Sequence, residues 1–172
     1  LTLTYGEILQ NGNFYRDNLR TAKSIYCYTS DGDNRLIRPH FTFFGFRYVK
    51  VEGAKIDKKT LDNFVGVSVR SDMAQTGRIE TSNEKLNKFI ENVFNSQKDN
   101  FLDIPMDCPQ RDERFGWTGD AQVFSETALF NADCAAFYSK YLENMRQEQL
   151  RYGGSCPFVV PDCFYAREEL YD

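Results

Sequence analysis

The spacing of hydrophobic residues changes from a strand-like to a helical pattern between residues 69 and 86. Residues 1–5 and 65–69 alternate, and residues 24–28 are rich in aromatic and β-branched side chains, as is typical of strands. Asn11-Gly12 and Asp31-Gly32 are typical of tight turns. We therefore predict that the first part of the chain is β-rich.

The strongest strand pattern covers residues 41–51, where bulky residues fall on both faces. A strand that is apolar on both sides is expected inside a sandwich of two sheets. Gly45 interrupts the run and suits a bulge or a kink. The adjoining His40, the single histidine, is expected to be a hydrogen-bonded sheet residue.

Three helices are predicted after the strand patterns end. Thr81 and Glu84 fit a capping box, and the next apolar residues have helical spacing as far as Phe101: Leu86, Phe89, Ile90, Val93 and Phe94. We predict a second helix over residues 121–130, with Asp120 at its N-terminus. A third runs from about residue 135 to a stop near Gly153-Gly154. We predict two domains, a β-rich one over residues 1–77 and a helical one over residues 78–172.

The densest cluster of ionisable groups lies between the first two predicted helices. Residues 107–120 read DCPQRDERFGWTGD and contain four carboxylates, two arginines and the only tryptophan. Pro105 and Pro109 predict irregular backbone before Arg111. A solvated charged loop is the ordinary interpretation of such a run. Phe115 and Trp117 favour a sugar site instead, because sugars bind aromatic faces beside carboxylates and arginine.

Composition and charge exclude several other classes of function. The net charge is −4 and no Lys/Arg run occurs, so a nucleic-acid partner is not expected. No apolar stretch is long enough for a membrane span. The five cysteines show no metal-binding spacing, and reduced thiols are expected. Cys108 is a poor candidate nucleophile, because His40 lies far away in the sequence.

Two stretches of the chain resemble one enzyme family. Residues 107–122, DCPQRDERFGWTGDAQ, look like the catalytic signature of bacterial α-L-rhamnosidases, which are inverting glycoside hydrolases with an (α/α)6 barrel. Residues 38–49 are similar to the strand that closes the β-sandwich before that barrel. The resemblance implies an α+β multidomain fragment, in which a β-sandwich portion is followed by the first helices of an (α/α)6 toroid.

The same resemblance assigns roles to five residues. It implies that Glu113 is the general acid, and that the sugar is bound or the acid supported by Asp107, Arg111, Trp117 and Asp120. It places the general base later in the barrel, outside this chain; Asp107 or Asp120 as the base is the alternative.

The expected activity is release of terminal α-L-rhamnose from a rhamnose-containing glycoside or oligosaccharide, with inversion. The fragment alone is expected to be inactive. We expect no cofactor and no metal, because arginines interleave with the carboxylates and would compete for them. The sequence does not decide whether the protein forms a homodimer or which aglycone it prefers. It also does not decide between a cytoplasmic and a periplasmic location in a bacterium. Two rival functions are a non-catalytic carbohydrate-binding or structural module and an exo-glycosidase acting on another sugar.

Overall fold

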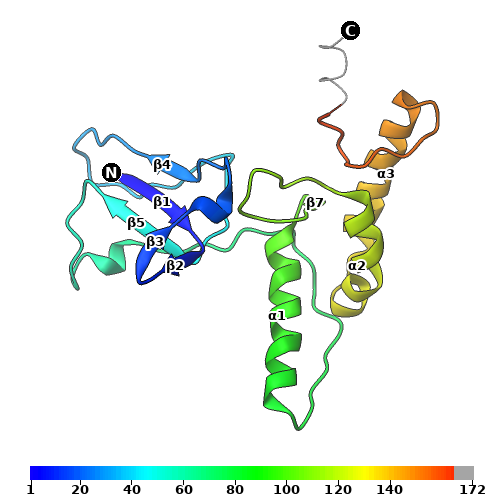
Figure 1. Ribbon diagram of the computed structural model, residues 1–172, viewed down its shortest axis with the longest axis horizontal. Coiled ribbons are helices and arrows are strands. Elements are labelled where there is room, and N and C mark those ends of the chain that lie inside the picture. The colour runs from blue at the N-terminus through cyan, green and yellow to red at the C-terminus, as the bar shows by residue number, and fades with distance from the viewer. Residues whose placement is uncertain (165–172) are drawn as a thin grey trace. The chain divides into compact units, whose positions relative to one another are not determined.

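The computed structural model describes residues 1–164; residues 165–172, which the sequence pattern leaves unassigned, lie outside the described residues. The chain divides into two compact units. The first, called here the β-rich unit, contains Leu1–Val69 together with Pro109–Glu113. The second, the helical unit, contains the remainder. Strands are followed along the chain by helices, as predicted (Figure 1).

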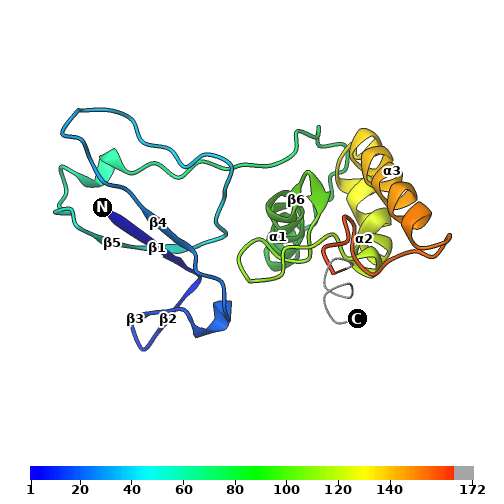
Figure 2. The same cartoon turned by 90° about the horizontal axis from the view of Figure 1, so that it is seen from above.

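The β-rich unit is built around the antiparallel pairing of β1 with two neighbouring strands. β1 (Thr2–Gly6) lies between β4 (Ile25–Cys27) and β5 (Tyr48–Glu52), as Figure 2 shows. β2 (Ile8–Gln10) and β3 (Asn13–Tyr15) form a separate hairpin. Its turn is at Asn11-Gly12, where both residues have positive φ, so the turn predicted there is confirmed. Two short 3-10 helices, η1 (Asp17–Leu19) and η2 (Leu61–Asn63), complete the unit.

The long strand predicted over residues 41–51 is wrong in its first part. Only Tyr48–Glu52 is a strand, because β5 pairs with β1 and the pairing ends at Gly6 opposite Tyr48. Among the described residues, no strand therefore pairs with residues 41–47, although Phe44 still packs. Its ring stacks on Tyr5 with centroids 4.2 Å apart.

The strand predicted over residues 65–69 is also wrong. No strand pairs with these residues in the described part of the chain, and Val65 and Val67 are 77% and 62% exposed. Alternation shows which face would be buried but does not supply the neighbour that satisfies the backbone. His40 lies outside the strands too, and its side chain is exposed. The prediction that it is a sheet residue is wrong.

The helical unit confirms the three predicted helices. They are α1 (Glu84–Asn100), α2 (Thr118–Asn131) and α3 (Ala135–Arg151), and a two-stranded pairing of β6 (Phe101–Leu102) with β7 (Ile104–Pro105) follows α1. The backbone after Pro105 is irregular up to α2, as its prolines predict.

The N-terminus of α1 is capped differently from the prediction. Asn83 is the cap, and its Oδ1 accepts from the backbone N–H groups of Lys85 and Leu86 at 3.0 and 3.3 Å. Thr81 instead exchanges hydrogen bonds with Asn87. The helix therefore begins too late for Thr81 to be the cap of a capping box.

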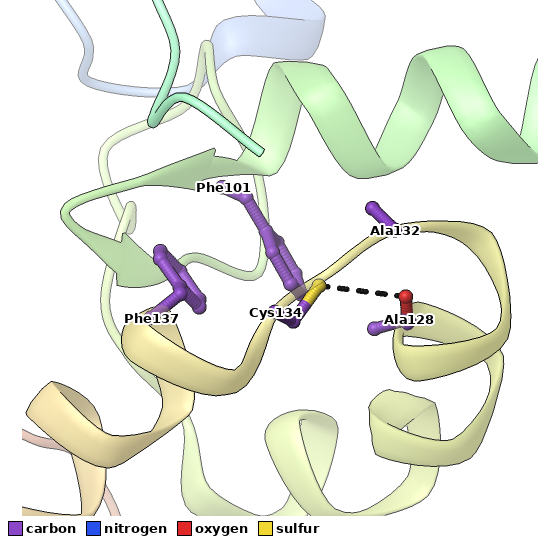
Figure 3. Close-up of a cluster of buried hydrophobic side chains, with 5 residues drawn as sticks. All are labelled: Phe101, Ala128, Ala132, Cys134 and Phe137. Carbon is purple, nitrogen blue, oxygen red and sulfur yellow. Dashed lines mark hydrogen bonds between the residues drawn. The ribbon is translucent and has the colours of Figure 1, made fainter. Parts of the chain in front are cut away.

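The core of the helical unit lies at the ends of the three helices. Phe101 and Phe137 stack at 4.6 Å over Ala128, Ala132 and Cys134, whose Sγ donates to the carbonyl of Ala128 at 3.4 Å (Figure 3). A second cluster joins α2 to α3 through Ala121, Tyr141 and Val160.

The start of the predicted apolar face of α1 is exposed. Leu86 and Phe89 are 43% and 62% exposed, so burial of that face is confirmed only towards Phe101. Within the described residues, no helix combines the length and apolar character needed to cross a membrane.

Candidate active site

The segment Pro109–Glu113 belongs to the β-rich unit, although the residues on both sides of it belong to the helical unit. The Gly45 N–H donates to the carbonyl of Pro109 at 3.2 Å. A Cβ at Gly45 would lie 2.9 Å from Pro109 C and from Gln110 Cβ, so only glycine permits this approach. Gln110 Nε2 donates to Glu7 Oε2 at 3.0 Å. The segment is therefore fixed at its start.

The end of the segment is held by Arg20 and Thr21. Arg20 Nε lies 2.9 Å from Asp112 Oδ1, and Arg20 Nη2 lies 2.6 Å from Glu113 Oε2. The backbone N–H of Thr21 donates to Asp112 Oδ2 at 3.3 Å, and the Thr21 hydroxyl donates to the same oxygen. One guanidinium thus contacts two consecutive carboxylates.

The pKa of Asp112 is held below its usual value by these contacts. The side-chain hydrogen bond from Thr21 is the main cause; the Thr21 N–H and the charge of Arg20 act in the same direction and outweigh partial desolvation. Asp112 therefore stays ionised as an anchor and is poorly suited to donate a proton.

Glu113, the predicted general acid, also contacts a predicted sugar-binding residue. Arg111 Nη2 lies 3.1 Å from Glu113 Oε2, the same oxygen that Arg20 contacts. The Glu113 side chain is 29% exposed, so it is oriented by two cations yet accessible. The structure thus brings Arg111 and Glu113 together.

Asp107 closes the loop that carries this segment. Its Oδ1 accepts from the Phe115 N–H at 2.9 Å, and its own N–H donates to the Phe115 carbonyl at 3.1 Å. Asp107 therefore has a structural role in the helical unit beside any contact with sugar.

Trp117 is positioned by the backbone around it. Its predecessor Gly116 accepts hydrogen bonds from the Tyr141 hydroxyl and the Val160 N–H, each at 2.9 Å. Trp117 forms a bridge with Val159. The half-buried tryptophan is thereby fixed just before the first residue of α2.

A cavity of about 500 Å³ lies in the helical unit and includes two predicted site residues, Asp107 and Asp120. Asp120 lies in the first turn of α2, as predicted, where the helix dipole favours a carboxylate. Phe101 and Phe124 supply apolar surface, and Gln97 and Asn100 supply amides. Trp117 is not among the residues that line this cavity. A cavity with two carboxylates, amides and aromatic edges suits a polyol.

Sequence reasoning missed Arg20 and Thr21. Residues 13–23 show no clean period, and an arginine in such a stretch has no local feature that points to a site. Only the fold brings them to Asp112 and Glu113.

Comparison with known proteins covers both units. Residues 1–70 match the bacterial α-L-rhamnosidase concanavalin-like domain, and residues 74–171 match the bacterial α-L-rhamnosidase 6 hairpin glycosidase domain. An α-L-rhamnosidase from Formosa agariphila is 44% identical over 96% of this chain. One from Streptomyces avermitilis is 39% identical over 88%. The chain spans 18% and 15% of the lengths of these two relatives.

Solved structures give the same result. The α-L-rhamnosidase of Aspergillus terreus has a TM-score of 0.86 and 40% identity, with 94% of this chain and 19% of that chain covered. The Streptomyces avermitilis enzyme complexed with L-rhamnose has a TM-score of 0.78 and 35% identity, with 94% and 16% covered. A concanavalin-like sandwich portion followed by helices of a hairpin glycosidase domain is the fold common to these matches. On this evidence, the chain belongs to the bacterial α-L-rhamnosidase family.

Proposed function

We propose that the full-length protein is an α-L-rhamnosidase that releases terminal α-L-rhamnose with inversion, and that Glu113 protonates the leaving oxygen. The observation that carries this proposal is the match to both rhamnosidase domains, joined to relatives named α-L-rhamnosidase at about 40% identity. A rhamnose-containing glycoside is the substrate class, as the L-rhamnose complex of the Streptomyces relative supports.

The geometry of the segment supports the choice of acid. Glu113 is partly exposed and oriented by two guanidinium groups, whereas the neighbouring Asp112 is engaged by Arg20 and Thr21. A proton donor must be held within reach of the leaving oxygen, and orientation by fixed partners serves that purpose. Glu113 is the better placed of these two adjacent carboxyls.

The remaining site residues receive binding roles in this proposal. Asp107 and Asp120 line the cavity in the helical unit and can accept hydrogen bonds from sugar hydroxyls. Arg111 orients Glu113, and Trp117 offers an aromatic face. The carboxylates of inverting enzymes stand roughly 6.5–9.5 Å apart on opposite faces of the sugar. We place the base outside these 172 residues.

The domain assignment belongs to the same proposal. Residues 1–77 form the C-terminal part of a β-sandwich domain, and residues 78–172 form the N-terminal part of the (α/α)6 catalytic barrel. The isolated chain is expected to be inactive on aryl α-L-rhamnosides, because inversion needs a general acid and a general base and we place the base outside this chain. Turnover by purified residues 1–172 that Glu113→Gln abolishes would promote Asp107 or Asp120 to base.

The deciding experiment compares leaving groups in the full-length protein. Glu113→Gln should lower kcat/KM for an alkyl α-L-rhamnoside by about 100-fold or more, because alkoxide leaves poorly without a proton. A dinitrophenyl rhamnoside, whose leaving group needs little protonation, should lose far less. NMR of the first-formed sugar should show the β-anomer. Equal activity of Glu113→Gln and wild type on the alkyl substrate would refute the acid assignment.

A panel of aryl glycosides tests the sugar. Rhamnosides should be cleaved faster than glycosides of other sugars, and the opposite order would favour another exo-glycosidase. Binding of rhamnosides without any turnover by the wild-type full-length protein would favour a carbohydrate-binding module.

A further inference from the structure

We infer that Arg20 is a positioning residue for Glu113, so that the β-rich unit orients the general acid. This inference rests on the proposed function. Arg20 lies in a loop of the β-rich unit that is far from the acidic segment in the sequence. The resemblance to rhamnosidases assigns no role to Arg20.

The first support is the bridging geometry. The Arg20 guanidinium contacts Asp112 Oδ1 through Nε at 2.9 Å and Glu113 Oε2 through Nη2 at 2.6 Å. A planar guanidinium fixes the directions of both contacts at once, which a point charge cannot do. Asp112 therefore serves as the fixed end, and Glu113 as the end that is oriented.

The second support is the rigidity of the loop that presents Arg20. Leu19, the preceding residue, is completely buried. The Arg20 N–H donates to the Asp17 carbonyl at 3.2 Å and ends η1. Thr21 then binds Asp112 through both its N–H and its hydroxyl. The guanidinium thus extends from a backbone that is tied on both sides.

The third support is the backbone conformation of Arg20. Its φ is +56°, in a region that side chains other than glycine seldom adopt. Such a conformation persists only where surrounding contacts determine it, and these residues gather at functional sites. Buried Leu19 and the Thr21–Asp112 hydrogen bonds are the contacts that determine it here.

Arg111 limits how much depends on Arg20. It contacts the same Oε2 of Glu113 at 3.1 Å, so loss of Arg20 still leaves Arg111 beside the carboxyl. Glu113 should then be misdirected but not lost. Since a shift of about 1 Å can cost about 100-fold in rate, an intermediate loss of about tenfold is expected.

The test uses Arg20→Ala and Arg20→Lys in the full-length protein, with two substrates. For an alkyl α-L-rhamnoside, Arg20→Ala should lower kcat about tenfold with little change in KM. For a dinitrophenyl rhamnoside, the loss should stay below about threefold, because that leaving group needs little proton transfer. Arg20→Lys should lie close to Arg20→Ala, since an ammonium group is a compact point charge without the planar fork that fixes the directions of both contacts.

Arg35→Ala is the matched control. Arg35 is likewise about half exposed in the β-rich unit and pairs with two carboxylates, Asp31 and Asp33, at 2.5 and 2.8 Å. Its removal should leave both substrates unaffected. Thermal unfolding of each variant shows whether the fold is retained. Because Arg20→Ala keeps a Cβ, it leaves the steric strain at the positive φ of position 20 unchanged and removes only the guanidinium contacts.

The outcomes separate this inference from the proposed function. If the wild-type protein cleaves no rhamnoside, the proposed function fails and the inference falls with it. If Glu113→Gln shows the leaving-group signature but Arg20→Ala does not, the inference alone is overturned. An equal loss on both substrates also overturns it, because that result indicates a purely structural role.

Discussion

The backbone of Thr21 and the carboxylate of Asp112 are joined at 3.3 Å, and the Thr21 hydroxyl donates to the same oxygen. This contact links a loop before β4 to the acidic segment that follows α1. Through it and the neighbouring Arg20, the orientation of Glu113 depends on residues from the opposite half of the sequence.

The Thr21–Asp112 contact predicts a pH dependence of stability. The pKa of Asp112 is lowered in the folded protein from its ordinary value of 3.8, first by the Thr21 hydroxyl. A lowered folded pKa gives stability that is present above pH 3.8 and is lost as the pH falls through the folded pKa.

Thr21→Val removes the hydroxyl and tests this dependence. In urea titrations, the free energy of unfolding of the wild type should exceed that of Thr21→Val at pH 5, and the difference should narrow on acidification below pH 3.8. A difference that widens on acidification would contradict the predicted direction of the pH dependence.

Gly45→Ala should impair activity by displacing the acidic segment. The new Cβ would lie 2.9 Å from Pro109 C, which real Cβ atoms do not tolerate, so the start of Pro109–Glu113 must move. A drop in kcat/KM of about tenfold or more is expected for an alkyl rhamnoside. Gly66→Ala is the control in the same unit, because its Cβ would meet no atom of residues 1–164 within 4 Å. Equal activity of the two variants would show that the approach at Gly45 does not matter.

Asp107 should prove to have two separable roles. Asp107→Ala removes the acceptor of the Phe115 N–H and should lower the free energy of unfolding by about 1–2 kcal/mol. Asp107→Asn keeps an acceptor oxygen and should recover most of that loss. If the charge also binds sugar, Asp107→Asn will still raise KM. Wild-type KM in a stable Asp107→Asn variant would restrict Asp107 to its structural role.

Two tyrosines of α3, Tyr138 and Tyr141, allow a controlled comparison of a hydroxyl with and without a hydrogen-bond partner. The Tyr141 hydroxyl is buried and donates to the Gly116 carbonyl at 2.9 Å, whereas the buried Tyr138 hydroxyl has no hydrogen-bond partner among the described residues. Burial raises the pKa of Tyr138 to about 12. Tyr141→Phe should destabilise by about 1 kcal/mol, and Tyr138→Phe should be neutral or stabilising. Thermal unfolding of both variants checks this order, and the reverse order would disprove it.

Chelation should leave the activity of the full-length protein intact. Asp112 and Glu113 are already paired with arginine, and a divalent cation would have to displace Arg20 or Arg111 from their carboxylates. Hydrolysis of an aryl α-L-rhamnoside is measured before and after EDTA. Activity that is lost in EDTA and restored by calcium or zinc would reverse the prediction.

The helices were predicted correctly from the sequence, whereas the strands predicted over residues 41–47 and 65–69 are not formed. A helix satisfies its own backbone, so the spacing of Ile90, Phe94 and Phe101 is sufficient to identify α1. A strand needs a partner strand elsewhere in the chain: residues 41–47 and 65–69 carry strand patterns, but no strand pairs with them among the described residues. Propensity within a window does not contain that information.

The candidate site likewise contains contacts that are local in the sequence, which could be predicted, and contacts that depend on the tertiary fold, which could not. Arg111 and Glu113 are close in sequence, and their pairing follows from local geometry. Asp120 at the start of α2 was also predictable, because a carboxylate in a first helical turn is favoured by the dipole. Arg20 and Thr21 were not, since only the tertiary fold brings their loop to Asp112.

The membership of Pro109–Glu113 in the β-rich unit has an evolutionary consequence. Recombination that exchanged only residues 1–69 between two relatives would import a new Arg20 and Thr21 but keep the old Asp112 and Glu113. A working chimera would need a donor whose residues at these positions are compatible. The two halves of the chain are therefore expected to be inherited together, and substitutions at position 20 should be accompanied by changes at position 112.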